Sequence, residues 1–376
     1  MRGRYSVLIL LLSVYITVVS FSGLVLVRAE PRTIIVPDDY PTIGWAIGNA
    51  SEGDTIFVKK GTYYETLQID KSLSLMGEDK TTTIIDVGEN ETENVVKSTQ
   101  DNVNMTGFTM QNARSSPLMP MGLAGILLIN ANYCNISGNI MTVNDYGIYV
   151  RSSSHNIIAE NHILNNVNGI RLLDNSSHNI IVDNNITEQI YDGILLRNYC
   201  DYNTIVGNLI INNRDGIGVW TTSDFISIYG NIISSNNNAG ILLSNLRNSS
   251  MVGNNITNND IGIWLYTSSN IIEFYHNNFI NNTIQVDTFP DNGNAWDNGV
   301  QGNYWDDYIG VDNNDDGIGD TPYIIDENNQ DNYPLMYPVD IGLIPEFPSW
   351  TILPMLIVST LVVIVVRTKI RKKGLE

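Results

Sequence analysis

The amino-acid sequence predicts an all-β fold: a right-handed parallel β-helix, or solenoid, of about 22–24 residues per coil, with a C-terminal transmembrane helix. The first observation behind this prediction is a Gly-Ile pair that recurs every 22 to 24 residues. The second is a series of asparagines in the same phase, and the third is an apolar segment near the end of the chain. The glycines are Gly125, Gly147, Gly169, Gly193, Gly216, Gly240 and Gly262, and the asparagines are Asn139, Asn161, Asn184, Asn208, Asn231, Asn254 and Asn277.

Each Gly-Ile pair opens a segment with the alternation of a half-buried β-strand. The first residue after the glycine is always isoleucine and the third is leucine or valine, whereas the second and fourth are mixed. Side chains alternate between the two faces of a strand, so each segment buries one face. The connecting segments are rich in Asn, Ser and Thr, which form helices poorly; this disfavours a leucine-rich repeat, which has a helical segment in every unit. Stacked coils would share one Ile/Leu/Val core.

The chain divides into seven segments. Residues 1–29 resemble a secretory signal peptide cleaved after Ala29, with an uncleaved anchor as the alternative. Residues 30–110 hold the N-terminal cap, with a short helix at 41–49, and the first coils; residues 111–291 hold the repeats, and 292–338 the C-terminal cap. A linker, 339–349, precedes the uncharged segment 350–366, which is long enough for a single membrane span, and the basic tail 367–376. Because basic tails stay in the cytoplasm, we expect the coils on the extracellular face of the membrane.

The region between the two apolar ends is strongly acidic. Residues 30–346 contain 12 of the 20 basic residues and 39 of the 40 acidic residues, which gives a net charge of −27. Such a surface repels nucleic acid, so a nucleic-acid partner is excluded. Nine Asn-x-Ser/Thr sequons are compatible with glycosylation outside the cell. The only two cysteines, Cys134 and Cys200, lie about three coils apart, too far for a disulfide.

The outward positions of the predicted strands place aromatic and arginine side chains in one strip. Its members are Tyr149, Arg151, Arg171, Arg197, Trp220, Trp264 and Tyr266. Aromatic rings stack on sugar faces and guanidinium groups bind carboxylates in pairs of hydrogen bonds, so the strip is a candidate glycan-binding surface. The alternative is a β-face that carries these side chains without a ligand.

The residues before two of the glycines form a candidate catalytic pair. Asp192 and Asp215 lie one coil apart, which would put their carboxyl groups near the separation of a retaining glycosidase. With Arg171 or Arg197 they could instead support elimination of an acidic polysaccharide around a Ca²⁺ ion. Asp-Gly is equally a common turn dipeptide, which leaves a structural role open.

Two sequence patterns suggest metal sites. Asp312, Asn314, Asp316, Ile318 and Asp320 fall at positions 1, 3, 5, 7 and 9 of a Ca²⁺ loop, with Gly317 at position 6. Position 12 is Tyr323 in place of the usual glutamate. His155 and His178 share one phase of the repeat and could hold a transition metal, or could simply stack at two successive turns.

Three further stretches carry a family resemblance. Thr33-Ile-Ile-Val-Pro-Asp-Asp-Tyr-Pro-Thr-Ile43, Lys71-Ser-Leu-Ser-Leu-Met-Gly77 and Gly302-Asn-Tyr-Trp-Asp-Asp-Tyr308 resemble the two ends of NosD-like proteins. The resemblance implies an extracytoplasmic β-helix with the repeat shared by carbohydrate-binding proteins and sugar hydrolases. In the namesake branch it implies a role in copper supply, although this chain has no Met- or His-rich run. Pro345-Glu-Phe-Pro348 resembles archaeal C-terminal sorting signals, some of which an archaeosortase cleaves.

These observations predict an anchored cell-surface β-helix that binds glycans or other envelope components without catalysis, with Ca²⁺ stabilising the C-terminal cap. The alternatives are an extracellular polysaccharide lyase or hydrolase that uses the Asp/Arg strip, and an accessory protein that handles copper.

Overall fold

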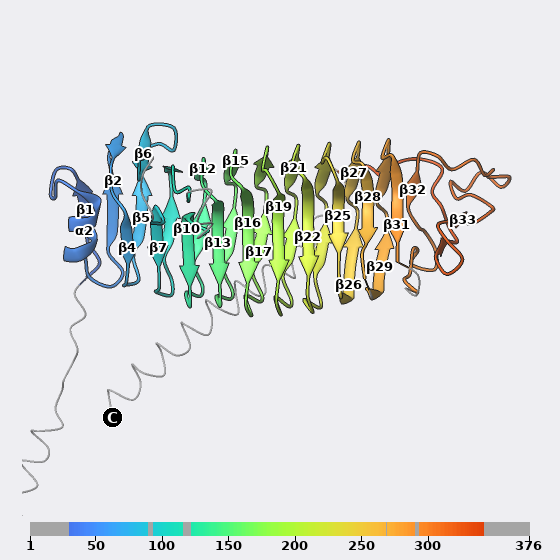
Figure 1. Cartoon of the computed structure of the whole chain (residues 1–376), viewed down its shortest axis with the longest axis horizontal. Helices are drawn as coiled ribbons and strands as arrows, with labels where there is room; N and C mark the ends of the chain where they lie inside the picture. Colours follow the sequence, from blue (N-terminus) through green and yellow to red (C-terminus); the bar gives the residue numbers. More distant parts are fainter. Residues whose placement is uncertain (1–29, 89–92, 116–121, 268, 290–292, 342–376) are drawn as a thin grey trace, which may run out of the picture. The chain divides into compact units, whose positions relative to one another are not determined.

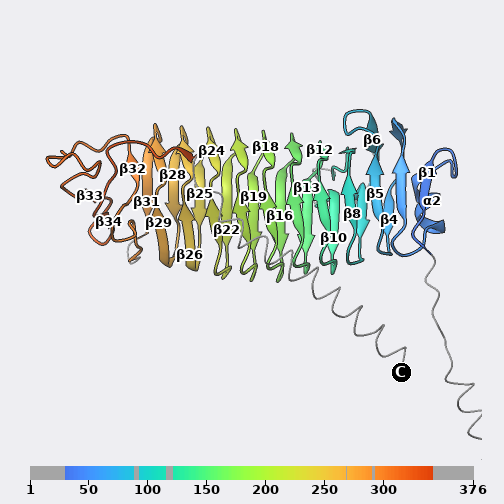
Figure 2. The same ribbon diagram turned by 180° about the vertical axis from the view of Figure 1, so that it is seen from behind.

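The computed structural model describes residues 30–88, 93–115, 122–267, 269–289 and 293–341. From Thr33 onward these residues form a stack of β-coils, shown from two sides in Figures 1 and 2. Successive coils place their strands in three parallel sheets, which in the described residues hold eleven (sheet A), eleven (sheet B) and ten strands (sheet C). The predicted parallel β-helix is confirmed.

The three sheets have the following strands. Sheet A contains β1 (Thr33–Val36), β2 (Thr55–Val58), β5 (Ser74–Gly77), β8 (Asn104–Thr106), β11 (Asn135–Ser137), β14 (Ile157–Ala159), β17 (Ile180–Val182), β20 (Thr204–Val206), β23 (Ser227–Tyr229), β26 (Arg247–Val252) and β29 (Asn270–Tyr275). Sheet B contains β3 (Gly61–Tyr63), β6 (Thr83–Asp86), β9 (Thr109–Gln111), β12 (Ile140–Thr142), β15 (His162–Leu164), β18 (Asn185–Thr187), β21 (Leu209–Ile211), β24 (Ile232–Ser234), β27 (Asn255–Thr257), β30 (Asn278–Ile280) and β32 (Tyr304–Trp305). Sheet C contains β4 (Leu67–Ile69), β7 (Val96–Ser98), β10 (Ala124–Ile129), β13 (Tyr146–Arg151), β16 (Asn168–Leu173), β19 (Asp192–Arg197), β22 (Asp215–Trp220), β25 (Ala239–Leu243), β28 (Ile261–Leu265) and β31 (Ile284–Thr288).

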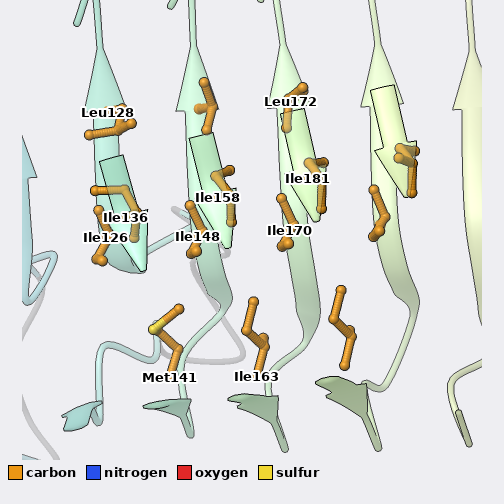
Figure 3. Packing of buried hydrophobic residues seen from close by; sticks show 14 of the residues in the cluster. Ile126, Leu128, Ile136, Met141, Ile148, Ile158, Ile163, Ile170, Leu172 and Ile181 are labelled. Atoms are coloured by element: carbon orange, nitrogen blue, oxygen red, sulfur yellow. The ribbon is translucent and has the colours of Figure 1, made fainter. Parts of the chain in front are cut away.

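The core is a set of aliphatic columns inside the stack (Figure 3). Ile126, Ile148 and Ile170 of sheet C lie in register on successive strands and are completely buried. Side chains from the other two sheets face them, among them Ile158 of sheet A and Ile163 of sheet B. The isoleucine after each repeat glycine therefore points inward, as the alternation predicts.

Two long ladders, made almost entirely of asparagine side chains, run along corners of the stack. The predicted series extends from Asn139 through Asn277 to Asn303. From Asn161 onward each side-chain oxygen accepts a hydrogen bond from the backbone N–H of the ladder residue one coil earlier, as Asn208 does from Asn184 at 2.9 Å. A second ladder, which the sequence did not single out, contains Asn144, Asn166, Gln189, Asn213, Asn236, Asn259 and Asn282. Both ladders satisfy buried backbone groups that the corners would otherwise leave unpaired.

Both ends of the stack carry additional structure. A short helix, α2 (Ile43–Asn49), forms within the stretch where the sequence predicts one, and the Glu65 carboxylate accepts hydrogen bonds from its first backbone N–H groups, those of Ile43 and Gly44. At the other end Trp305 is stacked between Phe279 and Tyr323, with 4.2 Å between ring centroids on each side. A small antiparallel pair, β33 (Tyr323–Ile324) and β34 (Gln330–Asp331), lies in this C-terminal region.

The signal peptide and the membrane anchor that the sequence predicts are not among the described residues. The signal peptide at 1–29, the transmembrane segment at 350–366 and the tail at 367–376 lie outside the described residues. Among the residues that are described, no helix is both long enough and apolar enough to cross a membrane.

Candidate functional site

The outer face of sheet C brings most of the predicted strip together. One column of side chains, in register from strand to strand, contains Gln68, Lys97, Leu127, Tyr149, Arg171, Leu195, Gly218, Leu242, Trp264 and Asp287. A second column contains Ile129, Arg151, Leu173, Arg197 and Trp220. Parallel strands are about 4.8 Å apart, so each column presents one side chain at every such interval.

A hollow lies towards each end of this face. The larger has a volume of about 480 Å³ and includes Lys97, Leu127, Tyr149 and Arg151 in its lining. The smaller, of about 330 Å³, includes Trp264, Tyr266, Asp287 and Phe289. The face is thus cationic towards its N-terminal strands and aromatic towards its C-terminal strands.

Arg171 is held between two tyrosines. Its guanidinium carbon lies 5.1 Å from the centre of the Tyr146 ring and 5.6 Å from that of Tyr149, and Nη1 donates to the Tyr146 hydroxyl. The Nε atom of Arg171 is buried and has no hydrogen-bond partner. Such an unpaired buried donor is rare in a folded protein and marks a place where a ligand acceptor would be stabilised.

The remaining strip residues differ in their exposure and in the side chains that they contact. The Nε atom of Arg151 lies 3.0 Å from a carboxylate oxygen of Asp174, and Arg197 is exposed at the end of β19. Trp264 and Tyr266 meet edge to face with centroids 5.3 Å apart, and Tyr266 also lies 5.7 Å from Trp220. These three rings form an aromatic cluster in which Tyr266 is 44% exposed.

Asp192 and Asp215 are paired in register on β19 and β22, but their environments are unlike. Asp215 is only 5% exposed; its carboxylate accepts from Asn238 Nδ2 at 2.5 Å and from the backbone N–H of Ala239 at 3.2 Å. Arg214 Nε lies 3.6 Å from its other oxygen. Asp192 is half-buried, and burial together with the neighbouring Asp215 charge raises its pKa to about 7. Asp192 can therefore exchange a proton near neutrality, whereas the Asp215 side chain is held by its hydrogen bonds to Asn238 and Ala239.

The predicted Ca²⁺ loop is folded by hydrogen bonds within itself. Asp312 accepts from the backbone N–H of Gly317 at 2.8 Å, and Asp316 accepts from that of Ile318 at 2.9 Å. Asp320 accepts from the backbone and side chain of Asn313. Asn314 donates to Asp316 at 2.9 Å. The described residues contain no group of three or more His, Cys, Asp or Glu side chains placed to hold a metal ion.

The two histidines belong to a longer stack of rings. His155 and His178 have ring centroids 4.9 Å apart, Tyr133 continues the stack on one side, and Tyr202 and then Phe225 continue it on the other. Burial, and then the nearby His178, lower the pKa of His155. Because the rings pack against each other's faces, the geometry resembles an aromatic ladder at the turns more than two nitrogens directed at one ion.

The family model described as "Periplasmic copper-binding protein (NosD)" matches residues 47–234 and 182–310. The chain belongs to the NosD family. No curated protein matches it.

Solved structures match this NosD-family protein at low sequence identity. Pectate lyase Pel9A has a TM-score of 0.56 and 15% identity, and the match covers 71% of this chain and 80% of that one. The Azotobacter vinelandii mannuronan C-5 epimerase AlgE6 A-module has a TM-score of 0.44 and 16% identity, over 67% of this chain and 92% of that one. The catalytic domain of a GH87 α-1,3-glucanase has a TM-score of 0.45 and 13% identity, over 74% and 70%. The likeness to pectate lyase Pel9A shows the fold alone.

The copper in the family's description does not fit the residues seen in this NosD-family protein. Across the described part of the chain no three His, Cys, Asp or Glu side chains gather to hold an ion, and the rings of His155 and His178 are tilted by 35° with their centroids 4.9 Å apart. Cys134 and Cys200 are buried free thiols, and burial raises the pKa of each to about 11, so neither offers a thiolate at neutral pH.

Sequence reasoning missed three residues of this face. Lys97 belongs to β7, whose segment lacks the Gly-Ile pair that set the phase. Tyr146 precedes a repeat glycine in the same register column as Asn168, and Gly218 is the one glycine in a column of side chains. Extending the alternation backwards to Val96-Lys97-Ser98 and reading the column across all coils would have found them.

Proposed function

We propose that the outer face of sheet C binds a polysaccharide chain lying along the stack, outside the cytoplasm. The observation that carries this proposal is the in-register column that joins the hollow at Lys97 and Tyr149 to the hollow at Trp264. From β13 to β28 there are five strand spacings, or about 24 Å. A pyranose residue advances an extended chain by close to one strand spacing, so consecutive sugars would meet consecutive side chains.

The charge distribution supports the same face. The region 30–346 has only 12 basic residues, yet sheet C presents Lys97, Arg151, Arg171 and Arg197 on one side. In a chain of such negative charge, this local concentration of cations favours a ligand with acidic or densely hydroxylated groups. The solved structure with the TM-score of 0.56 is a pectate lyase, which is compatible with a polymeric sugar ligand.

The distribution of sequons independently supports sheet C as the ligand-binding face. Of the eight sequon asparagines in the described residues, none lies in a strand of sheet C; the positions are Asn49 in α2, Asn104, Asn135 and Asn248 in sheet A, Asn185 and Asn255 in sheet B, and Asn175 and Asn281 in turns. Glycans attached to these asparagines would cover other surfaces and leave the sheet C strands accessible.

A second candidate function is cleavage or elimination of the bound polysaccharide, as a hydrolase or lyase. The pKa of Asp192, raised to about 7 by burial and by Asp215, favours it, since a general acid or base works best near the operating pH. Asp215 is too enclosed to act as a nucleophile, so we assign it the role of raising the pKa of Asp192 through its charge, and not of attacking the sugar.

The proposal also includes a Ca²⁺ site in the C-terminal cap and a C-terminal membrane anchor. We assign Asp312, Asn314, Asp316, Ile318 and Asp320 to a Ca²⁺ site that stabilises the C-terminal region when the ion binds. The family description is periplasmic, which accords with a location outside the cytoplasm. Export by residues 1–29, anchoring by residues 350–366 and cleavage of the anchor by an archaeosortase-type enzyme belong to the same proposal.

Binding and cleavage can be measured together on the full-length protein. We expect it to bind at least one member of a panel of acidic and neutral polysaccharides, and the double variant Tyr149→Ala, Trp264→Ala to lose that binding. Tyr202→Ala, which removes a 49%-exposed ring from the turn ladder, is the matched control and should bind normally. Chromatography of the same incubations detects cleavage. Equal loss in the control, or no binding across the panel, would refute the proposal.

A further inference from the structure

A third hollow lies at the corner where the chain passes from sheet B to sheet C. It has a volume of about 390 Å³, and its lining includes the buried residues Asn236 and Asn259 of the second ladder. The residues just before and just after the ladder positions complete the lining, from Asn212 in the first coil to Asn281 in the fourth. Three strand spacings, or about 14 Å, separate these two coils. We call this hollow the corner trough.

The corner trough is lined only by polar side chains. Every lining residue is Asn, Ser, Thr or Asp, and none is aromatic or basic. The residues before the ladder have a left-handed backbone, which asparagine tolerates, but Asn237, Asp260 and Thr283 on the other side do not. Amides and hydroxyls match the hydroxyl groups of a sugar, which donate and accept in the same way. The one charged residue, Asp260, is acidic, so the lining favours a neutral sugar over an anionic one.

A glycosylation sequon lies in this lining. Asn281-Asn282-Thr283 is an Asn-x-Thr sequence, and both its acceptor asparagine and its threonine line the trough and are exposed. Neither of the two hollows on sheet C has a sequon asparagine in its lining. Other sequons are placed differently: the asparagines in β11, β18 and β27 lie within strands, and their side-chain oxygens are buried.

The backbone of this sequon is held against the stack. The N–H of Asn281 donates to a carboxylate oxygen of Asp306 at 2.6 Å, and the N–H of Thr283 donates to the carbonyl of Asn259 at 3.1 Å. The acceptor is therefore fixed in the last coil of the trough. Asn258 and Asp260, one coil earlier, lie beside the path of a glycan that leaves Asn281 along the corner.

We propose that Asn281 carries an N-linked glycan whose first, neutral sugars lie in the corner trough against Asn258 and Asp260. A bond forms between the Asn281 amide nitrogen and C1 of an oligosaccharide held on a polyprenyl phosphate. The bond from C1 to the phosphate oxygen breaks, the amide nitrogen loses one proton, and the lipid leaves as its phosphate. A separate transferase supplies the catalysis, outside the cytoplasm. This inference does not depend on polysaccharide binding by sheet C and stands if that binding fails.

Peptide mass spectrometry of the full-length protein, purified from the cells that encode it, tests the attachment. We expect a glycan on the wild-type peptide that contains Asn281. Asn281→Gln and Thr283→Val should lose it completely, whereas Thr283→Ser keeps the hydroxyl and should retain it. An unmodified Asn281 in the wild type, or a glycan on this peptide in Thr283→Val, would overturn the proposal.

Melting temperatures test the position of the sugars. The double variant Asn258→Ala, Asp260→Ala keeps the sequon and removes two lining side chains. It should lower the melting temperature more in the glycosylated protein than in a Thr283→Val background, where no sugar is present to lose contacts. Asn165→Ala removes an exposed asparagine at the same left-handed turn position, two coils before Asn212, and should act equally in both backgrounds. Equal effects of the double variant in both backgrounds would show that the glycan does not lie in the trough.

A free oligosaccharide offers the same hydroxyl groups, and titration separates the two sources. We expect a neutral manno-oligosaccharide to bind the Thr283→Val protein only above about 1 mM, because attachment gives the first sugars an effective concentration in the millimolar range. Micromolar binding that Asn258→Ala, Asp260→Ala abolishes, together with an unmodified Asn281 in the wild type, would assign the trough to a free glycan and refute the attachment.

Discussion

Asp331 ends the first asparagine ladder: one of its carboxylate oxygens accepts a hydrogen bond from the backbone N–H of Asn303 at 2.7 Å, the place that a further ladder asparagine would otherwise take. The same oxygen accepts from the indole N–H of Trp305 at 2.9 Å, and the other oxygen from the backbone N–H of Tyr333 at 3.0 Å. Asp331 is completely buried. A single carboxylate thus closes the ladder and joins the last coil to the cap.

Replacing Asp331 with alanine should destabilise the protein strongly. The Asn303 and Tyr333 backbone N–H groups and the Trp305 indole would lose their acceptor, and each buried unpaired donor costs about 1–3 kcal/mol. We expect a fall in melting temperature of roughly ten degrees or more, measured by calorimetry. Asp297→Ala, which removes an acceptor of cap hydrogen bonds to Asn332 at the exposed surface, is the control and should shift the melting temperature far less.

The pH dependence of stability follows from the same carboxyl group. Burial raises the pKa of Asp331 to about 6, above its unfolded value of 3.8. A raised pKa means that the folded state binds the proton more tightly than the unfolded state. Protonation of Asp331 therefore adds its full contribution to the free energy of unfolding below pH ~4, and this stabilisation is lost as the pH rises through about 6. In Asp331→Asn the slope of melting temperature against pH between 4 and 7 should become more positive than in the wild type. An unchanged slope would contradict the assigned pKa.

Asn208→Asp tests the ladder itself. The Asn208 amide donates to the backbone carbonyls of Ile181 and Val206, at 2.9 and 3.0 Å, and a carboxylate cannot donate. The change leaves acceptors unpaired and buries a charge, so we expect a loss of about 3 kcal/mol or more, or a failure to fold. Asn212→Asp, at an exposed turn of the same coil, is the matched control. Comparable melting of the two variants by circular dichroism would argue against the ladder.

Ile170→Asp and Ile217→Asp should each prevent folding. Both isoleucines are completely buried in the sheet C column, where a carboxylate would have no partner. We expect insoluble or unfolded protein by circular dichroism. Ile180→Asp is the control, because Ile180 is 40% exposed on sheet A, and it should express and melt nearly as the wild type does.

Calcium should stabilise the C-terminal cap. Asp312, Asp316 and Asp320 can approach one another only if a cation offsets their repulsion, and binding to the folded state alone adds about 2.7 kcal/mol at a hundred times the dissociation constant. We expect the melting temperature to rise in Ca²⁺ and to fall in chelator, and the double variant Asp312→Ala, Asp316→Ala to lose this response. Identical melting of the wild type in both conditions would reduce the loop to a turn.

The fold was predictable because the repeat is a local signal. Each Gly-Ile pair fixes its own strand, and the spacing places every strand above the last, so the core columns followed from the sequence alone. The site was predictable only in part. Register gave the pairing of Asp192 with Asp215, but not the partners that enclose Asp215, because Asn238 and Arg214 lie on turns outside the strand pattern. The ring stack through His155 also extended beyond the histidines, since tyrosine and phenylalanine occupy the same left-handed turn position.

Because the coils are equivalent, the sheet C face can become longer or shorter in steps of one coil. Asn184 and Asn208 form the same hydrogen bonds to their neighbours, so removal of the 24 residues 185–208 would rejoin two matching ladder positions. Duplication of such a segment would add one strand to each sheet and about 4.8 Å to the face, without altering either end. A gene for this protein can therefore lengthen or shorten its ligand surface by whole in-phase units, and the side chains on the outer columns can diverge afterwards while the core stays the same.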